Sequence, residues 1–203
     1  MRANLYHGNC LDIMEDMIAK GIVIDAIITD PPYGLNYRDN KWDTEIPNWL
    51  PIAQRLTQLI GFTTAPTTQW DYPRPDWVCC WHRRAAASRS ANGGFNHWSP
   101  ILIYGKRKIP VDFYETSFGK TVHENKHLIH PSPKPLELYI WLVDKLTDDG
   151  ATVLDPFMGS GTTGDACAKL GRNFYGIEKD EEYLDEATRR IELAQQQMSM
   201  RMY

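Results

Sequence analysis

Short apolar runs alternate along the chain with stretches in which apolar residues recur at helical spacing. The runs predict strands near residues 5–6, 23–29, 61–64, 77–81, 100–104, 152–154 and 174–177. The helical spacing predicts helices over residues 11–20, 49–58, 136–146, 161–170 and from residue 180 onward. This alternation favours an α/β fold with a doubly wound, mostly parallel sheet. Residues 107–133 hold few apolar runs and are predicted to be an irregular insertion.

An acidic and aromatic turn, Asp30-Pro31-Pro32-Tyr33, directly follows the apolar run at residues 23–29. Open α/β sheets bind their ligands at the carboxyl ends of strands, so this turn is predicted to lie in an active site. The two prolines leave carbonyl oxygens free to accept from a ligand and hold the side chains of Asp30 and Tyr33 in set directions. A flat ring beside a carboxylate suits a planar substrate that carries an amine.

A glycine-rich loop at residues 159–164 follows the predicted strand at 152–154 and opens a helix. Its glycines allow close approach to a ligand, and Glu178, at the end of the next strand, is placed to accept from ribose hydroxyls. By itself the pattern is weak, because such loops also serve only to pack a helix on a strand. Asp155 and Phe157 stand between strand and glycines, which favours an adenosine ligand without a pyrophosphate.

The order of these two motifs predicts a circularly permuted sheet. After the glycine loop there is room for only one more strand and helix, so N-terminal strands must complete the sheet. The strands at 152–154 and 23–29 are then expected to lie side by side at the crevice where strand order reverses. Asp155 and Asp30 would end adjacent strands there, and the two motifs would form one site.

Composition narrows the class of protein. A chain of 203 residues with 42% hydrophobic content suits one domain with a full core. Neither a membrane-spanning run of about 20 apolar residues nor a signal-peptide pattern is found, so a cytoplasmic protein without a membrane partner is expected. The four cysteines form no C-x-x-C pair and are expected to be reduced and structural.

Positive charge is concentrated in the middle of an otherwise acidic chain. Residues 82–134 hold nine lysines and arginines against three acids, a balance of +6, whereas the rest carries −10 and the whole chain −4. A locally basic surface is what phosphate contacts need, although a merely solvated loop region would have the same pattern. The residues expected to contact a polyanion such as DNA are Arg83, Arg84, Lys106, Arg107, Lys108 and Lys120.

The two motifs together resemble those of S-adenosylmethionine-dependent DNA amino-methyltransferases, in the permuted group whose catalytic motif precedes the cofactor motif. Residues 30–33 match the catalytic motif and residues 155–163 the cofactor loop, while residues 130–136 resemble the segment that helps to hold the methionine part. The resemblance implies a Rossmann-like methyltransferase fold. It implies a single domain over residues 1–203, with a short target-recognition insertion near 106–130.

The resemblance also implies a reaction, methyl transfer from S-adenosylmethionine to N6 of an adenine flipped out of double-stranded DNA. The implied catalytic residues are Asp30, Pro31, Pro32 and Tyr33: the Tyr33 ring stacks on the base, and the Asp30 carboxylate and Pro31 carbonyl accept the amino hydrogens. No metal is implied. The implied cofactor-binding residues are Asp155, Phe157, Gly159, Ser160, Gly161, Thr162, Glu178, Asn9, Cys10, Lys134 and Pro135.

The chain departs from the family pattern in two places. Asn9 stands where the family usually has an acid that contacts adenine, so either its amide oxygen or Asp12 is expected to substitute. The short recognition segment implies short or relaxed sequence specificity, or specificity supplied by a homodimer or a second subunit. A companion restriction enzyme, as in restriction-modification systems, cannot be read from these residues.

Several alternatives stay open. N4-cytosine methylation and RNA adenine methylation use the same amine chemistry, and a non-catalytic DNA-binding subunit would keep the same fold. An NAD-linked oxidoreductase would explain the glycine loop but not residues 30–33. A zinc peptidase is suggested only by an H-E-x-x-H match at residues 123–127, whose proline-rich surroundings disfavour the stable helix that such a site needs.

Overall fold

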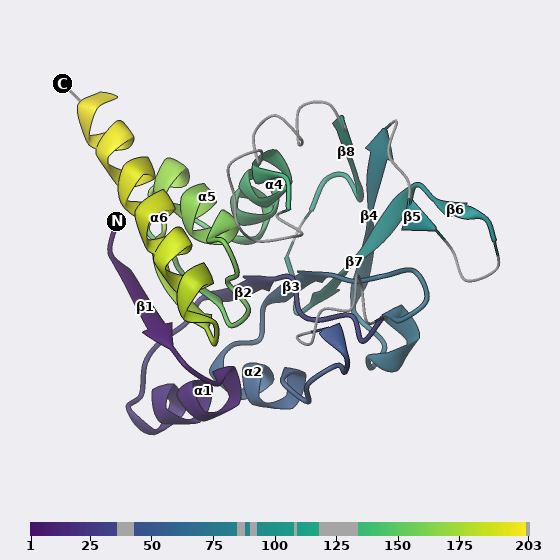
Figure 1. Ribbon diagram of the computed structural model, residues 1–203, viewed down its shortest axis with the longest axis horizontal. Coiled ribbons are helices and arrows are strands. Elements are labelled where there is room, and N and C mark those ends of the chain that lie inside the picture. Colours follow the sequence, from purple (N-terminus) through teal and green to yellow (C-terminus); the bar gives the residue numbers. More distant parts are fainter. Residues whose placement is uncertain (36–42, 85–87, 90–92, 108, 118–133, 202–203) are drawn as a thin grey trace.

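The computed structural model describes residues 1–35, 43–84, 88–89, 93–107, 109–117 and 134–201 (Figure 1). Its centre is an eight-stranded sheet in the order β1-β10-β9-β2-β3-β7-β4-β8. The strands in that order are β1 (Ala3–His7), β10 (Asn173–Glu178), β9 (Thr152–Asp155), β2 (Ala26–Thr29), β3 (Ile60–Thr63), β7 (Trp98–Tyr104), β4 (Trp77–Arg84) and β8 (Phe113–Ser117). The first five are parallel, β7 is antiparallel to both of its neighbours, and β8 is parallel to β4.

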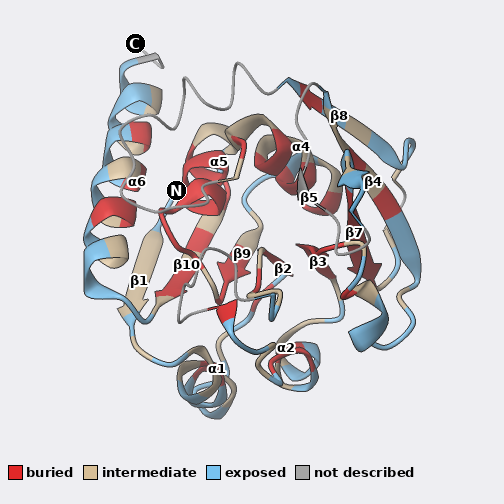
Figure 2. Cartoon of the chain, turned by 45° about the vertical axis from the view of Figure 1, so that its right-hand side comes forward, coloured by how far each residue is buried: buried red, intermediate tan, exposed pale blue. Residues whose placement is uncertain are grey.

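Helices cover both faces of this sheet (Figures 1 and 2). On one face lie α4 (Leu136–Leu146), α5 (Thr162–Leu170) and α6 (Glu181–Arg201), and on the other lie α1 (Cys10–Ala19) and α2 (Leu50–Leu56). Each face has its own apolar cluster, because the central strands are buried on both sides and present alternate side chains to the two layers. A 3₁₀ turn (Gln69–Asp71) and a small hairpin of β5 (Ser88–Arg89) and β6 (Phe95–Asn96) complete the described elements.

The sheet order confirms the doubly wound, mostly parallel architecture predicted from the sequence. β2 and β9 pair directly, with Ala26 opposite Val153 and Ile27 opposite Leu154. β1 pairs with β10, so an N-terminal strand completes the cofactor half of the sheet as expected. The description of this order as a circular permutation stays a prediction, as does the single domain over residues 1–203.

Two predicted segments were wrong. The strand expected at residues 23–29 is only Ala26–Thr29, because Asp25 turns its carboxylate onto the Thr152 backbone N–H at 2.7 Å and Val23 is 76% exposed. Residues 113–117, expected to be irregular, form the edge strand β8. Its alternation is too short to recognise in the sequence: Tyr114 packs against Trp141 of α4, and Thr116 accepts a hydrogen bond from the Trp81 indole. Residues 107 and 109–112 form no helix or strand, as predicted, and residues 108 and 118–133 lie outside the described residues.

Candidate active site

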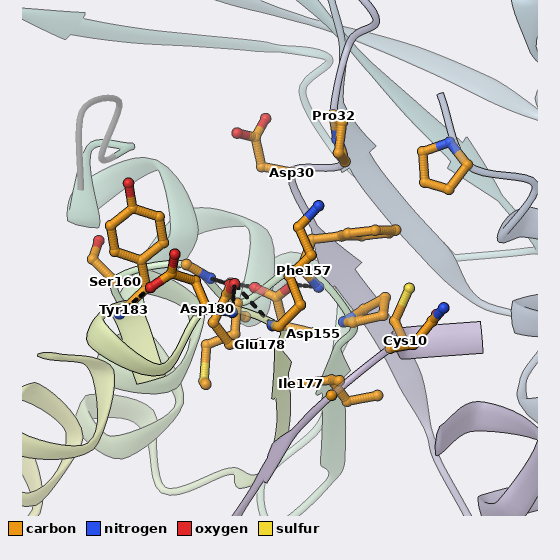
Figure 3. A pocket seen from close by; sticks show the side chains of 18 of the residues that line it. Cys10, Asp30, Pro32, Asp155, Phe157, Ser160, Ile177, Glu178, Asp180 and Tyr183 are labelled. Carbon is orange, nitrogen blue, oxygen red and sulfur yellow. Dashed lines mark hydrogen bonds between the residues drawn. The ribbon is translucent and has the colours of Figure 1, made fainter. Parts of the chain in front are cut away.

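A cavity of about 610 Å³ opens at the carboxyl ends of the parallel strands. Its wall is built from the ends of β1, β2, β9 and β10 and from the start of α4, which is where doubly wound sheets place ligands. Figure 3 shows Asp30 and Pro32 on one side of this cavity, across from Glu178 and Ile177. The catalytic and cofactor motifs of the sequence therefore border one space.

Asp155 joins the two motifs at the floor of the cavity. One carboxylate oxygen accepts from the Thr29 hydroxyl at 2.5 Å and from the Phe157 N–H at 3.0 Å, and the other accepts from the Thr163 hydroxyl at 2.5 Å. Burial raises the pKa of Asp155 to about 6, against the lowering effect of these donors. Because Thr29 ends β2 and Thr163 lies in the first turn of α5, this carboxylate fixes the end of the catalytic strand to the cofactor loop.

The glycine loop is held against the end of β10 by Glu178. One oxygen of its carboxylate accepts from the Gly159 N–H at 2.8 Å, and the other accepts from the N–H groups of Lys179 and Asp180 at 2.9 Å. Burial raises the pKa of Glu178. Gly161 has a φ of +78°, and an added Cβ would lie 2.9 Å from the Ala187 Cβ of α6, so only glycine fits both this turn and this packing.

The acidic turn after β2, residues 30–33, is held by a hydrogen bond within the turn and by hydrogen bonds to the carboxylate of Asp43. The Tyr33 hydroxyl donates to Asp30 Oδ1 at 2.6 Å, and the Thr63 hydroxyl at the end of β3 donates to the same oxygen. Asp43, which is 2% exposed, accepts from the backbone N–H groups of Tyr33 at 2.6 Å and Gly34 at 3.0 Å. The turn is therefore anchored at both ends by charge-assisted hydrogen bonds.

Lys134, just before α4, contacts the Asp30 carboxylate, and Tyr139 of α4 lies close to Thr63. The Lys134 ammonium forms an ion pair with Asp30 Oδ2 and lies 5.3 Å from the centroid of the Tyr33 ring. One turn into α4, the Tyr139 hydroxyl is 3.4 Å from that of Thr63. Burial, reinforced by the nearby Asp30 charge, holds the pKa values of Tyr33 and Tyr139 well above their usual range, so both hydroxyls keep their protons.

Most of the residues predicted for the site border the cavity. Those in its lining are Asn9, Cys10, Asp30, Pro32, Lys134, Asp155, Phe157, Gly159, Ser160, Thr162 and Glu178. Pro31, Tyr33, Gly161 and Pro135 are their direct neighbours in the chain. The Asn9 amide oxygen accepts from the Leu11 N–H at 2.9 Å and caps α1, and burial raises the pKa of Cys10 to about 11. What each residue does for a ligand stays a prediction.

The basic residues predicted to face DNA divide into two kinds. Arg107 donates to both oxygens of Asp148, at 2.8 and 3.1 Å, and Arg83 donates to the carbonyl oxygens of Asn96 and Trp98, so both stabilise the fold. Arg84 and Lys106 are exposed. Lys108 and Lys120 lie outside the described residues.

Sequence reasoning did not identify Thr29, Asp43, Thr63 or Tyr139 as parts of the site. Threonines at the ends of apolar runs are common, and only the pairing of β2 with β9 and β3 reveals that Thr29 and Thr63 face the two aspartates. The H-E-x-x-H match lies outside the described residues, and those that are described contain no metal-binding cluster of histidine, cysteine and acids. In the same part of the chain, no helix is long and apolar enough to span a membrane.

Comparison with known proteins agrees with this geometry. Residues 105–189 match the model of the N6/N4 DNA methylase family, described as DNA methylase. The chain is 28% identical over 210 residues to the methylase YubD of Escherichia coli K12, covering 94% of this chain and 91% of that one. The likeness to DNA methylases therefore extends over most of the chain.

Further similar proteins include a type II methyltransferase and solved structures. The type II methyltransferase M2.MboI of Moraxella bovis is 26% identical over 92% of this chain and 86% of its own. The M1.HpyAVI–SAM complex superposes with a TM-score of 0.71 at 25% identity, covering 93% of this chain and 99% of that one. The cytosine-N4-specific PvuII methyltransferase has a TM-score of 0.69 at 16% identity, covering 94% and 86%, which shows the shared Rossmann-like fold.

Proposed function

We propose that the protein transfers a methyl group from S-adenosylmethionine to the exocyclic amine of a base flipped out of double-stranded DNA, with N6 of adenine as the first choice. The observation that carries this proposal is the single cavity bordered by both motifs, in which Thr29 and Asp155 tie the acidic turn to the glycine loop. A nucleotide-binding module would need only the loop. The acidic turn at the same cavity favours a reaction on a second, amine-bearing ligand.

The cavity suits S-adenosylmethionine. Its volume of about 610 Å³ lies in the range of nucleoside-sized ligands. The carboxylates of Asp155, Glu178 and Asp180 line it, which favours a cationic ligand and disfavours the pyrophosphate of NAD. When bound, this cofactor supplies an electrophilic methyl group.

Individual residues have distinct roles in this proposal. The backbone of the glycine loop would approach the methionine part, while Glu178 keeps acceptor capacity for ribose hydroxyls and Phe157 and Ile177 offer apolar surface to the adenine. Asp30 Oδ2 and the Pro31 carbonyl would accept the two hydrogens of the target amine, drawing the nitrogen lone pair out of ring conjugation. Positioning and charge placement then provide most of the rate.

Cytosine N4 is the second candidate. The likeness to the cytosine-N4-specific PvuII enzyme favours it, whereas an aspartate, not a serine, at the first position of the acidic turn favours adenine. Exposed Arg84 and Lys106 are proposed to contact the DNA backbone. Assembly with a second copy or a specificity subunit is proposed because the segment near residues 106–130 is short for target recognition.

The direct test is to incubate the protein with labelled S-adenosylmethionine and unmethylated DNA, and to digest the product to nucleosides. N6-methyladenine is expected, and N4-methylcytosine would establish the second candidate. Absence of both, with cofactor bound, would refute the proposal. Asp30→Ala is expected to slow transfer by at least about 100-fold because it removes the amine acceptor, with cofactor affinity within about threefold of wild type. Undiminished activity would show that Asp30 does not position the amine.

A further inference from the structure

The Lys134 ammonium contacts both the carboxylate oxygen that is proposed above to accept from the target amine and the aromatic ring that is expected to stack on the base. It pairs with Asp30 Oδ2, and it lies 5.3 Å from the centroid of the Tyr33 ring, within the range of a cation–π interaction. Both charged side chains are largely enclosed, with 15% of Lys134 and 22% of Asp30 exposed. A nitrogen that donates hydrogen bonds therefore already stands between the carboxylate and the aromatic ring.

The other oxygen of Asp30 cannot easily serve the amine. Oδ1 accepts from the hydroxyls of both Tyr33 and Thr63, which leaves Oδ2 as the acceptor for a ligand in the cavity. Lys134 engages that oxygen. An incoming amine and the Lys134 ammonium thus compete for one acceptor.

We propose that Lys134 is a placeholder in the target-amine subsite: its ammonium holds Asp30 and the Tyr33 ring in place until the amine of the flipped base displaces it. This inference rests on the proposed function, because it takes the amine as the competing ligand. It assigns Lys134 as a positioning residue that acts through Asp30.

The placement of Lys134 in the fold suits this exchange. Its backbone directly precedes Pro135, the N-cap of α4, and α4 is anchored in the core by the buried residues Leu138, Leu142 and Val143. Its side chain is a flexible four-carbon stem that can withdraw while the helix stays in place. In the absence of a base, the ion pair also prevents Asp30 from being a mostly enclosed, uncompensated charge.

Displacement of Lys134 from Asp30 can be detected as a change in DNA affinity. If the subsite is open only when Lys134 has left Asp30, the apparent affinity for the target base is lowered by the fraction of molecules that are open. A lysine that merely contacts DNA would have the opposite effect, because loss of a positive charge weakens binding to a polyanion. The sign of the change in DNA affinity therefore separates the two roles.

The test compares wild type with Lys134→Met, which keeps the length but not the charge, and Lys134→Arg, which keeps the charge. Lys20→Met, at an exposed ion pair with Asp16 near the end of α1, is the matched control for surface charge. The kcat and KM for unmethylated DNA are measured, together with S-adenosylmethionine affinity by calorimetry. DNA affinity is also measured by fluorescence anisotropy, which needs no turnover.

For Lys134→Met we expect a KM and a dissociation constant for DNA that are about three- to tenfold lower. Its kcat should be lower than that of wild type, because Asp30 and the Tyr33 ring are then no longer held in place before the base arrives. Lys134→Arg should resemble wild type, and Lys20→Met should leave both DNA parameters unchanged or slightly weaker. Unchanged or weaker DNA binding by Lys134→Met would overturn the inference, as would a loss of cofactor affinity as the main effect. If wild type itself methylates no DNA, the proposed function fails, and the anisotropy series still decides the sign for Lys134.

Discussion

Asp43 offers the sharpest test of how the acidic turn is held. Asp43→Ala removes the acceptor of two backbone N–H groups, those of Tyr33 at 2.6 Å and Gly34 at 3.0 Å. Hydrogen bonds to a charged group each contribute about 1.5–3 kcal/mol, and the two share one oxygen, so the expected loss in free energy of unfolding is about 2–4 kcal/mol. For a chain of 203 residues each 1 kcal/mol lowers the Tm by about 2–4 °C, giving a decrease of about 4–16 °C.

The same change should affect chemistry more than cofactor binding. A displacement of Asp30 and Tyr33 by about 1 Å is enough to reduce transfer by about 100-fold, so kcat is expected to fall between about 10- and 100-fold with cofactor affinity within about threefold. Asp76→Ala is the matched control, because Asp76 accepts from the Gly105 N–H at 2.8 Å far from the cavity. It should lower the Tm but leave kcat per folded molecule unchanged.

The assay is methyl incorporation into DNA at saturating cofactor, at a temperature where circular dichroism shows each variant to be folded. Full kcat in folded Asp43→Ala would refute the reasoning, because the turn would then keep its geometry without its anchor. Equal losses of kcat in both variants would also refute it, since they would reflect general destabilisation.

Two further predictions concern the cofactor half of the molecule. Burial raises the Asp155 pKa from 3.8 to about 6. Between these two pH values the folded state therefore binds more protons than the unfolded state. The free energy of unfolding falls by on the order of 3 kcal/mol as pH rises through this range. In urea titrations from pH 4 to 7 the stability of wild type should fall more steeply than that of Asp155→Asn, in which other buried carboxyl groups such as Glu178 still titrate; parallel curves would contradict it. Gly164→Ala places a Cβ 2.4 Å from Ile191 Cδ1 and 2.8 Å from Phe174 Cε1, and should lower stability by about 1–3 kcal/mol in the same titration. Gly94→Ala, whose Cβ meets nothing within 4 Å, is its control, and equal stability of the two variants would contradict the packing argument.

Much of the architecture could be predicted from local pattern. Apolar runs and capping residues located the main helices, including the left-handed Gly171 that ends α5 and Asp180, whose carboxylate accepts from the Glu182 and Tyr183 N–H groups at the start of α6. The pairing of β2 with β9 also followed, because a sheet with too few strands after the glycine loop has to recruit N-terminal ones. β8 was not predicted, since it is stabilised by its contacts with β4 and α4 and not by its own pattern.

The candidate site, like the fold, could be predicted only in part. Its two motifs are contiguous in the sequence and were predicted, whereas the residues that orient them come from other elements. Thr63 reaches Asp30 from β3, and Asp43 reaches the Tyr33 backbone from beyond the turn, and neither residue type carries a signal of its own. Arg107 has a structural role that its charge did not reveal, because it donates to the Lys145 carbonyl at the end of α4 and to Asp148, while its contact with DNA stays a prediction.

The pairing of β2 with β9 has a consequence for how this enzyme can diversify. Neighbouring strands lie about 4.8 Å apart, a separation that backbone hydrogen bonds set and side chains do not. Asp30 directly follows one of these strands and Asp155 ends the other, so the spacing between the acidic turn and the glycine loop is set by the main chain. Changes in loops and surface residues would leave this spacing unaltered.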